Sequence, residues 1–168
     1  SFSYQAGAAG SASVTVEGAP LYQPVPAGTP TEPGVDVDYY VLSNPSWMPD
    51  FDAMTPYLSD VVPAINFPST SGAFATSGRA DNVGAVFTSL LEIPQTGWYR
   101  LSIESDDGSR LYVGDDLVVD NDGLHGMVEG SAVVALVAGK PPVRAEFFEN
   151  GGGAGLIVRY QGASISTR

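Results

Sequence analysis

The chain has 168 residues, 43% of them apolar and 10% aromatic, which is typical of a folded globular domain. It has no cysteine, so a disulfide framework and a thiolate metal site are excluded. The net charge of -12 disfavours nucleic acid and anionic membranes, and no apolar run reaches the roughly 20 residues that membrane insertion requires. Divalent cations and neutral ligands fit this charge better, although solubility in a salty or extracellular medium would also explain it.

Residues 1–34 differ in composition from the rest of the chain. They are small and polar, and closely spaced prolines interrupt their second half. We expect a linker, or an N-terminal extension that forms the tail of a preceding module. An alternating stretch at 11–16 leaves open a short strand that joins the main sheet.

The compact domain is expected over residues 35–168, and it begins with alternating β-branched and aromatic residues at 35–42. Residues 43–82 contain five prolines and are predicted to be irregular, with 54–56 and 61–67 packing on the sheet edge. A long ordered loop of this kind is often functional.

From residue 83 onward short apolar runs alternate with turns. The predicted strands cover 83–93, 98–105, 111–113, 117–119, 132–137, 143–148 and 156–160. Strands at roughly ten-residue spacing indicate an all-β sandwich or barrel, and no helix of three turns is expected.

Two adjacent carboxylates, Asp106 and Asp107, end one alternating run, and the next run begins two residues later. This spacing predicts the tip of a hairpin outside the packed region. Adjacent like charges repel unless a cation lies between them, and oxygen ligands favour a hard cation such as Ca²⁺. Because Asp and Gly are also ordinary turn residues, a solvated turn is the alternative.

Catalytic motifs are not evident. Asp120-Asn121-Asp122-Gly123 resembles part of an EF-hand loop, but Val118 would occupy the first ligand position, so a tight turn is expected instead. His125 has no nucleophile to activate and is expected to bond to backbone. Asp107-Gly108-Ser109 has no second copy with which to form an aspartic protease dyad. The chain is therefore not expected to be an enzyme.

The loop Asn150-Gly151-Gly152-Gly153-Ala154-Gly155 is rich in glycine. It does not open a helix, which excludes a phosphate-binding loop. It is either a flexible turn or a segment whose backbone carbonyls approach a metal or ligand closely, with Asn150 adding a neutral oxygen.

Several motifs, in order, resemble the PA14 domain family over about residues 35–162. These are Val37-Asp38-Tyr39-Tyr40, Met48-Pro49-Asp50-Phe51, Ile93-Pro94-Gln95-Thr96-Gly97-Trp98-Tyr99-Arg100-Leu101, Ser105-Asp106-Asp107-Gly108-Ser109-Arg110-Leu111-Tyr112-Val113, Val119-Asp120-Asn121-Asp122-Gly123-Leu124-His125-Gly126 and Val143-Arg144-Ala145-Glu146-Phe147-Phe148-Glu149-Asn150-Gly151-Gly152-Gly153-Ala154-Gly155-Leu156. The resemblance implies a PA14-type sandwich of two antiparallel sheets with long irregular loops.

In lectin-like members of this family, two consecutive aspartates joined by a cis peptide bind one Ca²⁺, and a second loop adds an amide side chain and backbone carbonyls. Carried over, the metal ligands would be Asp106, Asp107, Asn150, Gly152 and Ala154. The sugar-binding residues would be Asp106, Asp107, Asn150, Gly151 and Gly153.

The resemblance implies a calcium-dependent, lectin-like carbohydrate-binding module, of the kind found in adhesins, on an extracellular or cell-surface protein with further domains. Ca²⁺ takes about 6–8 oxygen ligands, so its open positions suit the vicinal hydroxyls of a neutral sugar. Two alternatives stay open: a structural spacer module in which calcium only stiffens a loop, and a targeting module of a glycoside hydrolase. The loop at 150–154 lacks the larger residues of the yeast adhesins, which predicts a shallow, permissive site.

Overall fold

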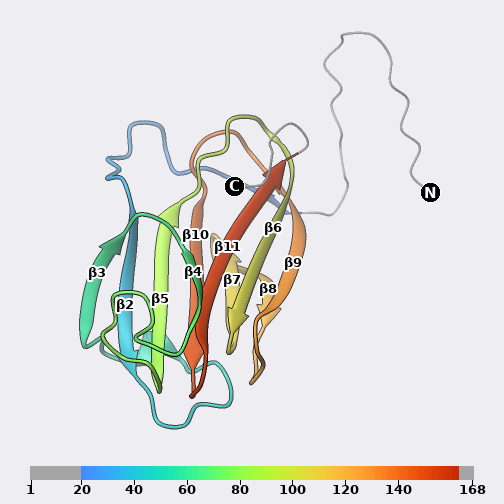
Figure 1. The fold of residues 1–168 in the computed structure, drawn as a ribbon. Coiled ribbons are helices and arrows are strands. Elements are labelled where there is room, and N and C mark those ends of the chain that lie inside the picture. Colours follow the sequence, from blue (N-terminus) through green and yellow to red (C-terminus); the bar gives the residue numbers. More distant parts are fainter. Residues whose placement is uncertain (1–19, 163–168) are drawn as a thin grey trace, which may run out of the picture.

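A computed structural model describes residues 20–162, which form two β-sheets joined by loops (Figure 1). The strands are β1 (Leu21–Tyr22), β2 (Val35–Val41), β3 (Leu58–Val62), β4 (Asn66–Thr70), β5 (Val83–Leu90), β6 (Gly97–Asp106), β7 (Ser109–Val113), β8 (Asp116–Asn121), β9 (Val128–Leu136), β10 (Pro142–Glu149) and β11 (Ala154–Gly162). The described part contains one short 3₁₀ turn, η1 (Phe51–Ala53), and no α-helix.

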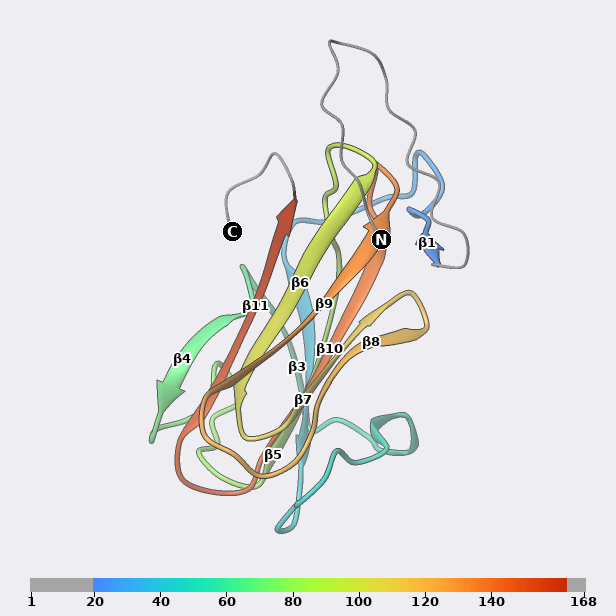
Figure 2. The same ribbon diagram turned by 90° about the vertical axis from the view of Figure 1, so that its right-hand side faces the viewer.

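One sheet has the strand order β1-β9-β6-β11-β4, and the other has the order β3-β2-β5-β10-β7-β8. All neighbouring strands are antiparallel except β1, which runs parallel to β9. Figure 2, turned by 90°, shows the same strands from the side. The predicted all-β fold of two packed sheets is confirmed.

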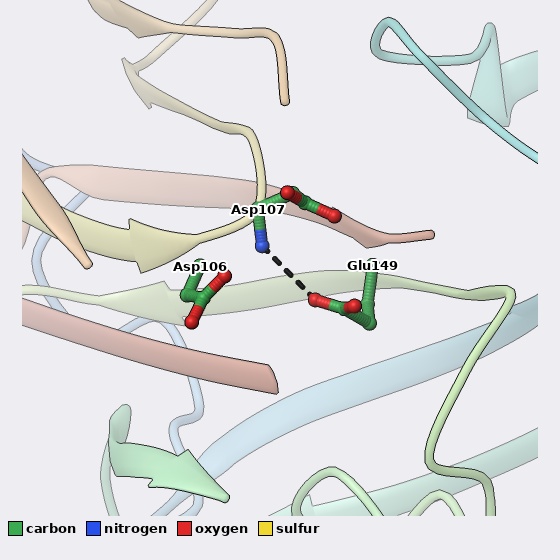
Figure 3. Close-up of side chains that lie close together, drawn as sticks. All are labelled: Asp106, Asp107 and Glu149. Atoms are coloured by element: carbon green, nitrogen blue, oxygen red, sulfur yellow. Dashed lines mark hydrogen bonds between the residues drawn. The ribbon is translucent and has the colours of Figure 1, made fainter. Parts of the chain in front are cut away.

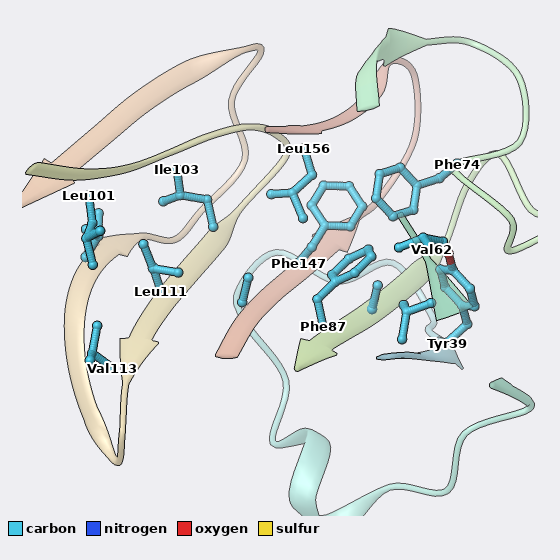
Figure 4. Packing of buried hydrophobic residues seen from close by; sticks show 14 of the residues in the cluster. Tyr39, Val62, Phe74, Phe87, Leu101, Ile103, Leu111, Val113, Phe147 and Leu156 are labelled. Atoms are coloured by element: carbon cyan, nitrogen blue, oxygen red, sulfur yellow. The ribbon is translucent and has the colours of Figure 1, made fainter. Parts of the chain in front are cut away.

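The core lies between the sheets because the alternating strands turn their apolar side chains inward. Phe74 stacks on Phe147, with ring centroids 4.3 Å apart, and Tyr39 and Phe87 pack edge-on against each other (Figure 4). From the five-stranded sheet, Leu156 lies beside Phe147, and Leu101 and Ile103 extend the same core across from Leu111 and Val113 (Figure 4). This core fixes the ends of β6 and β10, where Asp106 and Glu149 lie.

Two strands lie in the segment 43–82 that was predicted to be irregular. β3 pairs with β2 at one edge of its sheet, and β4 pairs with β11 at an edge of the other. Most of their side chains are exposed, so an inward-facing apolar pattern is missing from the sequence. The expectation that 61–67 packs on a sheet edge is correct, because backbone pairing holds these strands in place.

The segment before Val35 contacts the sandwich. Leu21 and Tyr22 pair with Ala135 and Leu136 of β9, and Val25 donates a backbone hydrogen bond to Lys140. The strand considered at 11–16 lies outside the described residues. None of the helical structure in residues 20–162 is long and apolar enough to cross a membrane.

The connection between β6 and β7 is not the expected hairpin. β6 belongs to the five-stranded sheet and β7 to the six-stranded sheet, so Asp107 and Gly108 cross from one sheet to the other. Asp107 is correspondingly buried, with 8% of its surface exposed, rather than at a tip outside the packed region. An alternating pattern identifies both strands but does not distinguish a hairpin from a crossover.

Candidate functional site

The site begins at the crossover from β6 to β7, where the two adjacent aspartates lie. The peptide bond between Asp106 and Asp107 is cis. Asp106 is the last residue of β6 and pairs with Gly155 of β11, whereas Asp107 lies in the inter-sheet connection. Gly108 follows, and a side chain there would clash with Phe148, since its Cβ would lie 2.4 Å from that ring. The turn therefore requires glycine at this position.

A third carboxylate, that of Glu149 at the end of β10, joins the pair. One oxygen from each of Asp106, Asp107 and Glu149 lies within 4.8 Å of the others. Figure 3 shows the Glu149 carboxylate directed toward the two aspartates, with its Oε2 accepting a 3.1 Å hydrogen bond from the Asp107 amide. The strand ends thus bring together three acids, two of which are buried.

Backbone amides hold the Asp107 carboxylate in place. Oδ1 accepts a hydrogen bond from the His125 amide at 3.1 Å, and Oδ2 accepts one from the Asn150 amide at 3.0 Å. The His125 ring contacts the backbone oxygens of Asn121 and Gly126, as expected for a loop histidine. Asp107 therefore connects the loop after β8 with the loop before β11.

The acids lie close enough to perturb one another. Burial, with added repulsion from Asp107 and Asp106, raises the pKa of Glu149 to about 8. Burial also raises the pKa of Asp106, and the Asp107 carboxylate adds to this effect. Both shifts mean that each carboxyl loses its proton less readily than it would in water, because burial and neighbouring negative charge disfavour the ionised form.

Among residues 20–162, no basic side chain forms an ion pair with these three acids. Four of the five arginines in that range pair elsewhere: Arg110 with Asp120 and Asp122, Arg144 with Asp52 and Glu146, Arg100 with Glu129, and Arg159 with Glu104 and Glu129. The fifth, Arg79, forms no ion pair within residues 20–162. Calcium is a hard cation that prefers carboxylate and carbonyl oxygens. The donor set at the end of β6 and β10 fits such an ion.

The glycine-rich loop at 150–153 lies beside the acids. The Gly152 amide donates to Asp81 at 3.2 Å, and Gly152 has φ +114°, which favours glycine. A Cβ on Gly153 would lie 2.8 Å from Asp106 Oδ2, so the loop passes close to that carboxylate. Gly151 is exposed, and Ala154 is buried at the start of β11. The two segments expected to form one site are therefore neighbours.

Three residues of the site, Glu149, Ser69 and Asp81, were not predicted from the sequence. Glu149 ends an apolar run, and its position directly before Asn150 was the available signal. Ser69 donates to Asp106 Oδ2 at 3.2 Å, and Asp81 accepts from the glycine loop. Ser69 and Asp81 come from the segment without periodicity, so no pattern indicated them.

The Asp120–Gly123 segment begins with the last two residues of β8 and continues into a bend, so the expected tight turn is wrong for Asp120 and Asn121, whereas the expected side-chain to backbone bonds are present. Asp122 Oδ1 accepts a hydrogen bond from the Gly123 amide at 2.7 Å, and Asp120 Oδ1 accepts one from the Asp122 amide at 3.3 Å. Arg110 neutralises both carboxylates. These acids are compensated within the protein and need no added cation.

Comparison with known proteins gives a family and a set of similar folds. The family described as PA14 domain matches residues 31–167. Two solved structures have a TM-score of 0.70: an anti-sigma factor domain-containing protein, 22% identical, and the PA14 sugar-binding domain from an RTX adhesin, 19% identical. The epithelial adhesin 9 A domain from Candida glabrata, in complex with Galb1-3GlcNAc, has a TM-score of 0.65 and 13% identity.

These similarities differ in how much of each chain they cover. The alignment spans 82% of this chain and 94% of the RTX adhesin domain, and 89% of this chain and 91% of the C. glabrata domain. It spans 82% of this chain but only 46% of the anti-sigma factor protein. A search of curated protein sequences finds no match.

Proposed function

The chain belongs to the PA14 domain family, and on that premise we propose that it is a calcium-dependent carbohydrate-binding module of a larger secreted or cell-surface protein. The observation that carries this proposal is the uncompensated acid cluster, in which Asp106 and Asp107 meet Glu149 within 4.8 Å and without an arginine or lysine partner among residues 20–162. Such a cluster is costly to bury unless a cation binds it.

The ion would be held by the side chains of Asp106, Asp107 and Asn150 and by the backbone oxygens of Gly152 and Ala154. The amides of His125 and Asn150 hold Asp107 through both of its carboxylate oxygens, which limits its movement before an ion arrives. The hydrogen bond from Ser69 does the same for Asp106. Preorganised ligands of this kind lower the entropic cost of binding.

Calcium would supply Lewis-acid positions to which two vicinal hydroxyls of a neutral sugar could bind. The exposed Gly151 and the neighbouring Gly153 leave room beside the acids because neither carries a side chain. Two structurally similar domains support sugar as the ligand: one is named a sugar-binding domain from an adhesin, and the other was solved with a disaccharide. With no bulky side chain from 151 to 154, single sugars should bind weakly, and repeated modules would add avidity.

A structural spacer is the second candidate, and the burial of Asp107 and Glu149 favours it. An ion held by buried acids would tie the β6–β7 crossover to the end of β10 whether or not a sugar is present. The two functions share a calcium site and differ in the ligand.

A glycan screen with and without a calcium chelator separates them. The carbohydrate-binding function predicts retention of at least one diol-bearing glycan that is lost with chelator and restored with excess calcium. Calcium binding with no glycan retained at any density would contradict that function and leave the spacer. The Asp122→Asn variant serves as a control in the same screen. Asp122 is a neighbouring acid that already pairs with Arg110, so its loss should leave glycan retention as it is in the native chain.

A further inference from the structure

Glu149 is the most completely buried acid among the described residues, and half of its carboxylate has no partner there. It has 0% of its surface exposed. Its Oε2 accepts the Asp107 amide, but its Oε1 is buried and has no hydrogen-bond donor within residues 20–162. A buried carboxylate oxygen without a partner is costly, so it indicates a missing ligand.

Glu146, three residues earlier on the same strand, shows how this chain ordinarily buries an acid. It has 6% of its surface exposed, and it pairs with Arg144 at 2.8 Å and with the Tyr112 hydroxyl at 3.1 Å. Both of its oxygens therefore have partners. Both glutamates are buried and both lie on β10, but only Glu146 has a partner for each oxygen. Burial on this strand therefore does not explain why Oε1 of Glu149 has no partner.

The direction of the Glu149 side chain points to what is missing. Its carboxylate faces the two aspartates (Figure 3), and one oxygen from each of the three acids lies within 4.8 Å of the others. Ca²⁺–oxygen distances are about 2.3–2.6 Å, so two oxygens on one ion lie at most about 5.2 Å apart. The spacing meets this pairwise limit, so the three carboxylates could hold one metal ion between them.

We propose that Glu149 is a third carboxylate ligand of the calcium ion, binding it through Oε1 while Oε2 keeps the Asp107 amide. The inference rests on the proposed function and adds a ligand that approaches from the buried side of the site. Each oxygen of Glu149 then has one partner, so Oε1 is no longer buried without one. Asp107 is held by its amide as well as by its carboxylate.

A third carboxylate changes what the site binds. With Glu149 the donor set carries three negative charges, so the ion is held without help from sugar hydroxyls. Calcium binding should then precede sugar binding and be measurable in its absence. Trivalent lanthanides should compete strongly for the same position, because their radius is similar and their charge is higher.

The test is a calcium titration of the native chain, Glu149→Gln and Glu146→Gln by calorimetry without sugar. Glutamine keeps the size of Glu149 and an oxygen to accept the Asp107 amide, but it loses the charge. We expect at least a tenfold loss of calcium affinity in Glu149→Gln and less than a threefold change in Glu146→Gln. Equal affinities in all three proteins would overturn the role of Glu149.

Europium luminescence decay in H₂O and D₂O provides a second readout, since it counts the water molecules on the bound ion. Glu149→Ala should raise that number by about one relative to the native chain, and Glu146→Gln should leave it unchanged. An unchanged count in Glu149→Ala would mean that Glu149 is not a ligand. Should Glu149→Ala not fold, Glu149→Asp, which keeps the charge on a shorter side chain, is measured with the same expectation.

These outcomes separate the two proposals. A native chain that binds neither calcium nor europium would overturn the proposed function and this inference together. Tight calcium binding that is insensitive to residue 149 would overturn this inference alone. Calcium binding that depends on Glu149, with no glycan retained, would support the ligand role and contradict the carbohydrate function.

Discussion

Two groups of acidic side chains lie on or beside β6, β7, β8 and β10, and they are neutralised in different ways. Asp120, Asp122 and Glu146 pair with Arg110 and Arg144. Asp106, Asp107 and Glu149 have backbone amides and the Ser69 hydroxyl as partners, and they pair with no arginine in the described part of the chain, residues 20–162. The first group, which we call the paired acids, is complete within the protein. We propose that the second group, the unpaired acids, is completed by a cation.

The comparison shows why net charge alone is a poor guide to metal binding. The chain has 19 acids, and arginines pair with six of those in residues 20–162: Asp52, Glu104, Asp120, Asp122, Glu129 and Glu146. Burial without a counter-charge distinguishes the site from the rest of the surface, because desolvation of a charge costs several kcal/mol unless it is paired.

The largest expected effect comes from removing one of the unpaired acids. Asp107→Ala should abolish calcium binding and lower the melting temperature even in chelator, because the amides of His125 and Asn150 both lose their acceptor. Both hydrogen bonds are partly buried, and a buried donor left unpaired costs about 1–3 kcal/mol, so the loss for each amide should fall toward the lower end of that range. Calorimetry and thermal melts measure the two effects.

Asp122→Ala is the matched control for Asp107→Ala. Asp122 also accepts two backbone amides, those of Met48 and Gly123, and it pairs with Arg110. It should cost comparable stability and leave calcium affinity within threefold. If Asp122→Ala removed calcium binding as completely as Asp107→Ala, the distinction between paired and unpaired acids would be wrong.

A smaller effect is expected on the pH dependence of stability without calcium. Glu149 has a pKa of about 8 in the folded chain and an ordinary value of 4.5. Between these values the folded chain keeps a proton that the unfolded chain has released, so stability should fall as the pH rises from about 5 to about 8. The stability that protonation of Glu149 contributes is fully present at a pH below its pKa in the unfolded chain. It is lost at a pH above its pKa in the folded chain.

Melting temperatures in chelator across this range give the measurement. Glu149→Gln carries no such proton, so its melting temperature should fall less with pH. A native chain whose melting temperature changed with pH no more than that of Glu149→Gln would mean that Glu149 is not perturbed by its neighbours.

The smallest effect concerns the glycine loop. Gly153→Ala would place a methyl 2.8 Å from Asp106 Oδ2 and 2.7 Å from Ser69 Oγ, whereas the nearest atom to a methyl at Gly151, Asp81 Oδ1, is 3.8 Å away. Gly153→Ala should therefore displace Asp106 and weaken calcium binding by about three- to tenfold. Gly151→Ala should change it by less than twofold. Equal affinities for the two variants, measured by calcium titration, would mean that the loop does not approach the acids as closely as described.

The sequence predicts the framework of this molecule better than its site. Alternating runs such as 98–105 identify β6 because one face is buried, and the same logic fails for β3 and β4, whose side chains are mostly exposed. Whether β6 and β7 form a hairpin or cross between sheets depends on which strands each one pairs with. That is a long-range property with no local pattern.

The site was predictable where it is carried by adjacent residues. Asp106 and Asp107 draw notice because like charges are neighbours in the chain. Glu149 cannot be recognised in this way. Its missing partner results from the position of the end of β10 next to the β6–β7 crossover, which is a feature of the folded chain. Asp81 and Ser69 reach the site from an irregular segment and an edge strand, where spacing carries no information about contact.

The most direct test of the account is a calcium titration of the native chain followed by calorimetry and by its melting temperature. We predict one ion per chain and a melting temperature that rises with calcium, by the equivalent of about 2.7 kcal/mol at 100 times the dissociation constant. The double variant Asp106→Asn/Asp107→Asn should show neither effect. A native chain with no calcium heat and a melting temperature that chelator does not change would contradict the claim that the unpaired acids form a cation site.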